Sequence, residues 1–139
     1  MIKCIMFDFD GTLVDSNEVK REAFFTVSDH LSSSQKIMFE ILSMTDLGDR
    51  YDILKRYSKR LKEEFKFVID EDLLVEKYSA ICEENVSLAQ SILGFDSLLN
   101  YLKKTDIKVI ISSATPIITL KKIIINRKIH HFFDHIYGS

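Results

Sequence analysis

The sequence of 139 residues contains only two cysteines and one proline. Two cysteines cannot form a disulfide framework, and Cys4 and Cys82 lack the spacing of a metal-ligand motif. We expect both thiols to be reduced and packed in the interior. The sequence also lacks internal repeats and tracts of low complexity, so nothing in it argues for a solenoid or a disordered segment.

The chain has no excess of charge of one sign, because 19 Lys and Arg residues are matched by 21 Asp and Glu residues, a formal net charge of −2. No basic field therefore argues for nucleic acid. Residues 50–66 are rich in Lys and Arg, but Asp52, Glu63 and Glu64 interrupt them, which is typical of a solvated helix face. We expect no nucleic-acid partner.

Long hydrophobic runs are also absent. No window reaches the length of a membrane span, and the N-terminus lacks the apolar stretch of a cleavable signal. Hydrophobic residues make up 46% of the chain and charged residues 29%, the balance of a folded globular protein. We expect no membrane partner and a cytoplasmic location.

Two short apolar runs end abruptly in polar residues. Residues 2–7 are followed by Asp8, and residues 108–111 are followed by Ser112 and Ser113. Strands of parallel α/β sheets are apolar on both faces because helices cover both sides, although runs this short also fit a buried helix turn. Ligands of such sheets bind at the carboxyl ends of the strands. The pattern predicts an α/β protein with a three-layer, parallel-sheet core.

A helical pattern fills the stretch between these runs. Asp15 and Ser16 can cap a helix that has Val19, Ala23 and Val27 on one stripe. Further helices are expected over about 35–44, 49–65 and 71–88. Residues 15–89 should therefore form an all-helical insert in a core made of residues 1–14 and 90–139.

Two more helices are expected after the insert. The first covers about 95–104. The second follows the strand at 108–111, with Thr115 as its cap and Pro116 at its first position, where the missing N–H costs nothing.

The stretch Asp8-Phe9-Asp10-Gly11-Thr12 is the most informative part of the sequence. Two carboxylates two residues apart at a strand end project to the same side. Such close like charges repel, and Mg²⁺, which prefers carboxylate oxygens, is the usual remedy. One carboxylate could then attack phosphorus while its neighbour, protonated, serves the leaving oxygen. For an isolated pair of this kind, two acids capping a turn is the commoner explanation.

The apolar strand followed by D-F-D-G-T-L-V-D-S resembles the first signature motif of the haloacid dehalogenase superfamily. The resemblance implies that Asp8 is the nucleophile that forms an aspartyl-phosphate and that Asp10 is the general acid and base. It also implies that the Asp8 carboxylate and the Asp10 main-chain carbonyl bind Mg²⁺, with Gly11 and Thr12 near the phosphate. An aspartate at the second position implies a phosphatase or phosphomutase, not a dehalogenase.

Residues 109–116 are similar to the second motif of that superfamily, in which a Ser or Thr binds the phosphoryl oxygens. The spacing to Pro116 favours Ser113 over Ser112, and Ala114 belongs to the same expected phosphate site. A hydroxyl and free N–H groups at a helix N-terminus suit a phosphate. The alternative is an ordinary Ser/Thr helix cap.

The helical insert resembles the mobile lid of phosphoglycolate-phosphatase-like members. Asn17, Lys20 and Arg50 are candidate substrate contacts of that lid, the alternative being solvated or capping residues. His130, His131 and His135 lack the acid or cysteine that would complete a metal site, so a surface turn is expected there.

Residues 133–139 resemble the third strand of the superfamily core. The superfamily pattern continues with a lysine and an acidic motif, which do not occur before Ser139, so the resemblance implies a core that is incomplete at its C-terminus. With the superfamily's strand order 3-2-1-4-5, the first strand becomes an edge. We expect another chain, such as a second copy, or a further segment of the protein to lie against residues 2–7, or the isolated chain to be aggregation-prone and poorly stable.

The leading hypothesis is therefore a Mg²⁺-dependent phosphatase of a small phosphorylated metabolite. Sugar phosphates, phosphoglycolate and nucleotides remain open as substrates. The alternatives are a catalytically impaired fragment or non-catalytic module that binds phosphate or Mg²⁺, and a phosphomutase.

Overall fold

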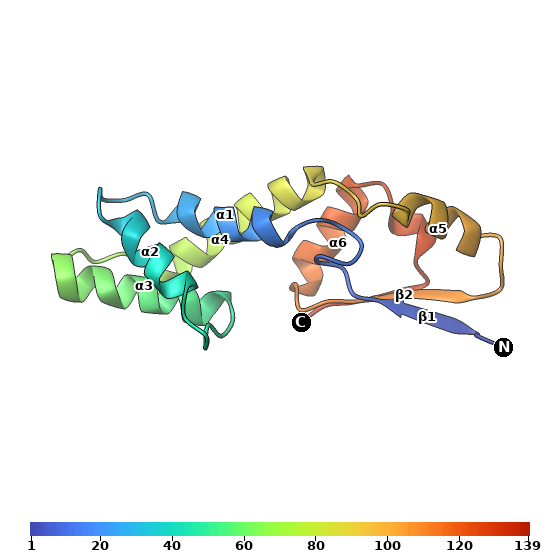
Figure 1. The fold of residues 1–139 in the computed structure, drawn as a ribbon, viewed down its shortest axis with the longest axis horizontal. Helices are drawn as coiled ribbons and strands as arrows, with labels where there is room; N and C mark the ends of the chain where they lie inside the picture. The colour runs from blue at the N-terminus through green and yellow to red at the C-terminus, as the bar shows by residue number, and fades with distance from the viewer. The chain divides into compact units, whose positions relative to one another are not determined.

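The computed structural model describes residues 1–139. Figure 1 shows the fold and labels the α-helices and the first two strands. The strands are β1 (Cys4–Phe7), β2 (Lys108–Ser112) and β3 (His135–Tyr137). The helices are α1 (Asn17–Val27), α2 (Ser34–Leu42), α3 (Arg50–Phe65), α4 (Glu71–Leu88), α5 (Phe95–Leu102) and α6 (Ile117–Asn126), and a short 3-10 helix, η1, covers His130–Phe132. No helix is both long enough and apolar enough to cross a membrane.

The strands form one parallel sheet in the order β1-β2-β3, so β1 is an edge, as predicted. Phe7 lies opposite Ile111, and Ile111 lies opposite Ile136. This register brings the carboxyl ends of all three strands to the same edge of the sheet. The residues that follow these strands, including Asp8 and Ser113, therefore meet at that edge.

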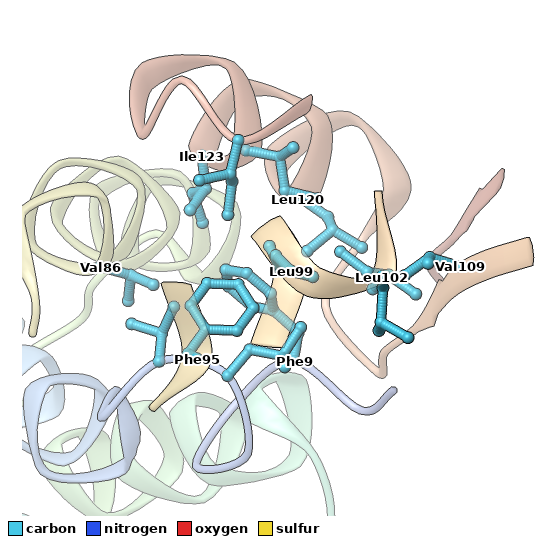
Figure 2. Packing of buried hydrophobic residues seen from close by; sticks show 13 residues of the cluster. Phe9, Val86, Phe95, Leu99, Leu102, Val109, Leu120 and Ile123 are labelled. Carbon is cyan, nitrogen blue, oxygen red and sulfur yellow. The ribbon is translucent and has the colours of Figure 1, made fainter. Parts of the chain in front are cut away.

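The hydrophobic core lies against one face of this sheet. Val109 and Ile111 of β2 point into it, and α5 and α6 supply most of the remaining side chains. Figure 2 shows how the cluster also receives Phe9 from the loop after β1 and Val86 from α4. The members from α5 and α6 are Phe95, Leu99, Leu102, Leu120, Ile123 and Ile124.

The opposite face of the sheet is left uncovered by α5 and α6. Met6 is 60% exposed and Tyr137 is 53% exposed, and Ile110 between them is half-buried. The α/β class and the parallel sheet are confirmed, and α5 and α6 pack on one face of the sheet. The prediction that Cys4 is packed is wrong, because alternate side chains of this edge strand face the uncovered side; Cys82 is buried as expected.

The chain divides into two compact units, one made of Met1–Lys20 with Cys82–Ser139 and the other of Arg21–Ile81. Every element between β1 and α5 is a helix, as predicted. The predicted insert, residues 15–89, contains the second unit and extends beyond it at both ends, because the limits of that unit fall inside α1 and α4. The predicted domain boundaries stay a prediction.

Candidate active site at the carboxyl ends of the strands

The loop after β1 is anchored by Phe9. Its side chain is completely buried in the core, and its carbonyl accepts the N–H of Leu13 at 3.0 Å and that of Val14 at 3.2 Å. Because Phe9 points into the core, its neighbours Asp8 and Asp10 are left outside it. Asp8 is exposed and Asp10 is partly buried. The apolar residue between the two acids thus presents both carboxylates at the sheet edge.

Gly11 makes the sharp turn that follows. Its φ is +72°, in the left-handed region that a residue with a side chain adopts at a cost. A Cβ at this position would also collide with the side-chain amide of Asn17, at the start of α1. The loop and the first turn of α1 are therefore in close contact, and only glycine fits between them.

The loop after β2 is built around Ser113. Its N–H donates to the carbonyl of Tyr137 at 3.0 Å, and its hydroxyl accepts the N–H of Thr115 at 3.0 Å. The side chain of Thr115, only 4% exposed, lies inside the site. This loop therefore presents two hydroxyls towards the loop after β1.

The end of β3 supports the same loop. The backbone at Gly138 lies so close that a Cβ there would approach the Cα of Ile117 and the carbonyl oxygen of Thr115, each to 2.6 Å. Ser139 donates its N–H to Thr115 O at 3.2 Å and its hydroxyl to Ala114 O at 2.9 Å. The three residues that end the chain thus hold the loop after β2 in place.

The Asp10 carboxylate is the meeting point of the two loops. Its Oδ2 lies 2.6 Å from Lys20 Nζ and accepts the hydroxyls of Thr115 at 2.8 Å and Ser113 at 3.3 Å. Its Oδ1 accepts the hydroxyl of Ser16 at 2.6 Å. Residues far apart in the sequence therefore converge on one carboxylate.

The protonation of Asp10 follows from these contacts. Burial by itself raises the pKa of this carboxyl, but the ammonium of Lys20 and the hydrogen bonds from Lys20, Ser16 and Thr115 outweigh it and hold the pKa below its ordinary value of 3.8. The sequence predicts that a divalent cation offsets the repulsion between the two carboxylates. In the structure, Lys20 supplies a positive charge at Asp10.

The oxygen atoms left available around Asp8 are of the kind that Mg²⁺ prefers as ligands. One Asp8 oxygen accepts the Thr12 hydroxyl at 3.1 Å, and the other has no protein partner. The main-chain carbonyl of Asp10 accepts none of the hydrogen bonds of the loop. Mg²⁺ takes carboxylate and carbonyl oxygens and keeps several waters, so these two ligands fit it. The structure contains no group of three or more His, Cys, Asp or Glu side chains that could hold a metal ion.

Several N–H groups of the two loops already have acceptors in the protein. Ser113, Thr115 and Ile117 donate theirs to Tyr137 O, Ser113 Oγ and Ser139 O. In the first loop, Gly11 donates its N–H to Val14 O and Thr12 donates to Phe9 O at 3.4 Å. The N–H of Ala114 has no protein partner. In the loop of residues 113–116, this N–H is therefore the one left for a phosphate, beside the hydroxyls around it.

The predicted role of Thr115 as a helix cap is wrong. The residue before α6 is Pro116, in an extended conformation, and the helix begins at Ile117. Thr115 lies one residue too early to cap that helix, and its hydroxyl binds Asp10 instead. Ser113, in contrast, lies where the sequence predicted, beside the first loop.

The candidate lid contacts lie in different places. Asn17 packs against Gly11, and Lys20 binds Asp10 and Thr115. Arg50 belongs to the other unit, at the start of α3. Their predicted contacts with a substrate stay predictions. His130, His131 and His135 are exposed, as expected for a surface turn.

Sequence reasoning missed Ser16, Thr115 and Gly138 as parts of the site. Ser16 and Thr115 looked like ordinary helix caps, because a hydroxyl before a helix is the usual sign of one. For Gly138, the resemblance of residues 133–139 to a third strand was a usable signal, but it did not indicate that this glycine packs against the backbone of Thr115 and Ile117. Lys20 was singled out with a different role.

Comparisons with known proteins agree with this architecture. The family described as haloacid dehalogenase-like hydrolase matches residues 5–139, and the chain belongs to that family. A search of curated proteins found no match.

Solved structures of this fold resemble nearly the whole chain. A protein named as a HAD hydrolase, YfnB from Bacillus subtilis, bound to magnesium, is 22% identical with a TM-score of 0.68, over 99% of this chain and 65% of that one. A protein assigned as a β-phosphoglucomutase from Thermotoga maritima is 15% identical with a TM-score of 0.69, and the match covers 99% of this chain and 61% of that one. CbbY from Rhodobacter sphaeroides, in complex with xylulose-1,5-bisphosphate, is 17% identical with a TM-score of 0.61, and the match covers 100% of this chain and 64% of that one. The chain thus spans less than two thirds of the length of each of these structures.

Proposed function

We propose that this protein hydrolyses phosphoric monoesters of small metabolites with Mg²⁺, through an aspartyl-phosphate formed on Asp8. The observation that carries the proposal is the convergence of the two loops, in which Ser113 Oγ lies 3.3 Å from the Asp10 carboxylate at the edge where Asp8 follows β1. A nucleophile, a proton carrier and a hydroxyl for the phosphoryl oxygens then share one small site. Membership of a hydrolase family supports this reading.

In the first half-reaction, an oxygen of Asp8 attacks phosphorus in line with the leaving oxygen, and Asp10 gives that oxygen a proton. Ser113 Oγ would turn its proton from Asp10 to a phosphoryl oxygen, and the N–H of Ala114 would donate to another, so that both fix the orientation of the phosphoryl group. The Asp8 carboxylate and the Asp10 carbonyl would hold Mg²⁺, which when bound offsets the negative charge of the phosphoryl group. In the second half-reaction, water releases phosphate from Asp8, and Asp10 takes up a proton of that water.

The substrate is proposed only as a class. One of the similar structures holds a sugar bisphosphate, which supports a small phosphorylated metabolite. A panel of sugar phosphates, phosphoglycolate and nucleoside monophosphates, read out as free phosphate, would identify the preferred member. A phosphomutase would give an isomerised sugar phosphate instead of free phosphate. Partners of other classes and the cytoplasmic location stay predictions.

The direct test is hydrolysis of p-nitrophenyl phosphate by the wild-type chain, with and without EDTA. Activity should require Mg²⁺ and disappear in Asp8→Asn, which keeps the shape of the side chain and removes the charge of the nucleophile. Asp15→Asn is the matched control, because Asp15 is an exposed acid that follows the same loop. Activity that survives in Asp8→Asn would exclude Asp8 as the nucleophile. Binding of Mg²⁺ without any turnover would favour the non-catalytic module.

A further inference from the structure

The Asp10 carboxylate is held by four donors of the protein itself. Lys20 Nζ lies 2.6 Å from Asp10 Oδ2 and donates at 2.8 Å to Thr115 Oγ1, whose own proton goes to the same Oδ2 at 2.8 Å. Lys20, Thr115 and Asp10 thus form a closed triangle of contacts. Ser16 and Ser113 add one hydroxyl each.

The surroundings of Asp10 favour a carboxylate over a carboxylic acid. Lys20 Nζ, which can only donate, lies 2.6 Å from Oδ2, and the hydroxyls of Ser16, Ser113 and Thr115 can donate as well. Oδ2 already has three of these partners, so a proton would be taken up at Oδ1, where Ser16 is the one partner. The structure therefore holds Asp10 in the form that can accept a proton.

The two oxygens of Asp10 are not equally occupied. Three donors share Oδ2, but only Ser16 contacts Oδ1, which can accept at two positions. The lysine and the threonine fix one oxygen and leave the other with room for a further donor. Oδ1 is thus the oxygen at which a water could bind.

We propose that Lys20 and Thr115 are positioning residues for the second half-reaction, holding Asp10 so that Oδ1 activates the water that releases phosphate from Asp8. This inference rests on the proposed function. In that step, the water oxygen forms a bond to phosphorus while one of its protons passes to Asp10 Oδ1. The bond between phosphorus and the Asp8 oxygen breaks, and its electron pair restores the Asp8 carboxylate. The products are inorganic phosphate and a protonated Asp10, which is the form that the next first half-reaction uses.

The test is the lifetime of the phosphoenzyme. With p-nitrophenyl phosphate, nitrophenolate leaves without needing a proton, so a variant that loses only the position of Asp10 should be phosphorylated normally and hydrolysed slowly. Lys20→Met should therefore give a burst of nitrophenolate and a covalent phosphate on the chain, found by mass spectrometry after an acid quench. We expect the phosphoenzyme to decay at least about tenfold more slowly than in the wild type, since small errors of position cost this much or more.

Lys20→Arg should restore part of the decay rate, because it keeps the positive charge. Thr115→Val removes the shared hydroxyl while keeping the shape, Thr115→Ser keeps the hydroxyl, and the valine variant alone should accumulate phosphoenzyme. This second pair tests the inference if Lys20→Met does not fold. Lys122→Met is the control for the loss of a lysine. It removes the ion pair in which Lys122 Nζ, on α6, lies 3.2 Å from Glu83 Oε2.

The proposed function and the inference about Lys20 and Thr115 can fail separately. If neither the wild type nor any variant forms a phosphoenzyme on Asp8, the proposed function is overturned, and the inference is overturned with it. If the phosphoenzyme forms but decays at the wild-type rate in Lys20→Met and Thr115→Val, the inference alone is overturned. It is also overturned if both half-reactions slow equally, because a general structural role or a substrate contact would do that.

Discussion

At the scale of single residues, two glycines show which part of the site depends on close packing. Gly11 and Gly94 both have left-handed backbones, with φ of +72° and +86°. A Cβ on Gly11 would collide with the amide of Asn17, whereas one on Gly94 would meet nothing within 4 Å. The two positions share the backbone cost and differ in the space around them.

Gly11→Ala should therefore destabilise the protein more than Gly94→Ala. Both substitutions place a side chain in the left-handed region, which costs roughly 1–2 kcal/mol. Only Gly11→Ala must also displace the exposed end of the Asn17 side chain, which adds a smaller cost of roughly 0.5 kcal/mol. The free energies of unfolding in urea would measure the difference. Equal losses would mean that the contact between the loop and α1 is not tight.

At the scale of elements, the turn between α1 and α2 is tied to α3 by a histidine and a tyrosine. The Tyr57 hydroxyl donates to Ser28 O at 2.8 Å, and His30 Nδ1 lies 3.2 Å from the same hydroxyl oxygen. Because the tyrosine proton is already used, Nδ1 must carry the hydrogen and donate to Tyr57. Burial and, to a smaller extent, the charge of Lys77 lower the pKa of His30 below its ordinary value of 6.5, against weaker opposing effects of Asp29 and Ser28.

This lowered pKa predicts how the stability of the unit Arg21–Ile81, which contains His30, depends on pH. The folded protein binds a proton at His30 less readily than the unfolded chain does, so His30 favours the folded state above about pH 6.5. That contribution is lost as the pH falls through the folded-state pKa. The free energy of unfolding should decrease between pH 7.5 and 5, and decrease less in His30→Asn.

Titration of the histidine ring signals by NMR gives an independent check. His30 should titrate below its ordinary value of 6.5. Titration of His30 at or above that value would contradict the assignment of its surroundings.

At the scale of the whole molecule, the edge strand β1 is the main unsatisfied surface. Its outer side pairs with no strand, Met6 is 60% exposed, and Ile2 just before it is 66% exposed. Unpaired edges with apolar side chains tend to pair with other chains. We propose that the protein self-associates along residues 2–7.

Met6→Lys should reduce this association, because a lysine on an edge strand opposes pairing with a second chain. Met44→Lys is the matched control, since Met44 is 50% exposed but belongs to the other unit, Arg21–Ile81. Sedimentation under reducing conditions, which prevent cross-linking through the exposed Cys4, would measure the oligomeric state. Equal association in wild type and Met6→Lys would rule out this edge as the contact.

Most of the fold could be predicted from local patterns. The helix predicted over 49–65 is observed as Arg50–Phe65, because Asp49 and Asp52 form a capping box that fixes its start. The helix predicted over 71–88 matches α4 at both ends. The first strand was predicted to begin at residue 2. It begins at Cys4, which is the first residue with a partner in β2.

The sequence by itself determined the two acids, the serine and the sheet edge where they meet. This was possible because the alternation around the buried Phe9 is a local property, while the resemblance to the family supplied the serine and the order of the strands. Only the tertiary structure decided what surrounds Asp10. Lys20, Ser16 and Thr115 reach that carboxylate because α1 and the loop after β2 are packed at one edge, and Gly138 lets β3 approach that loop. A hydroxyl before a helix looks the same in the sequence whether it caps the helix or binds a carboxylate, and the difference depends on which residues distant in the chain the fold brings within 3 Å.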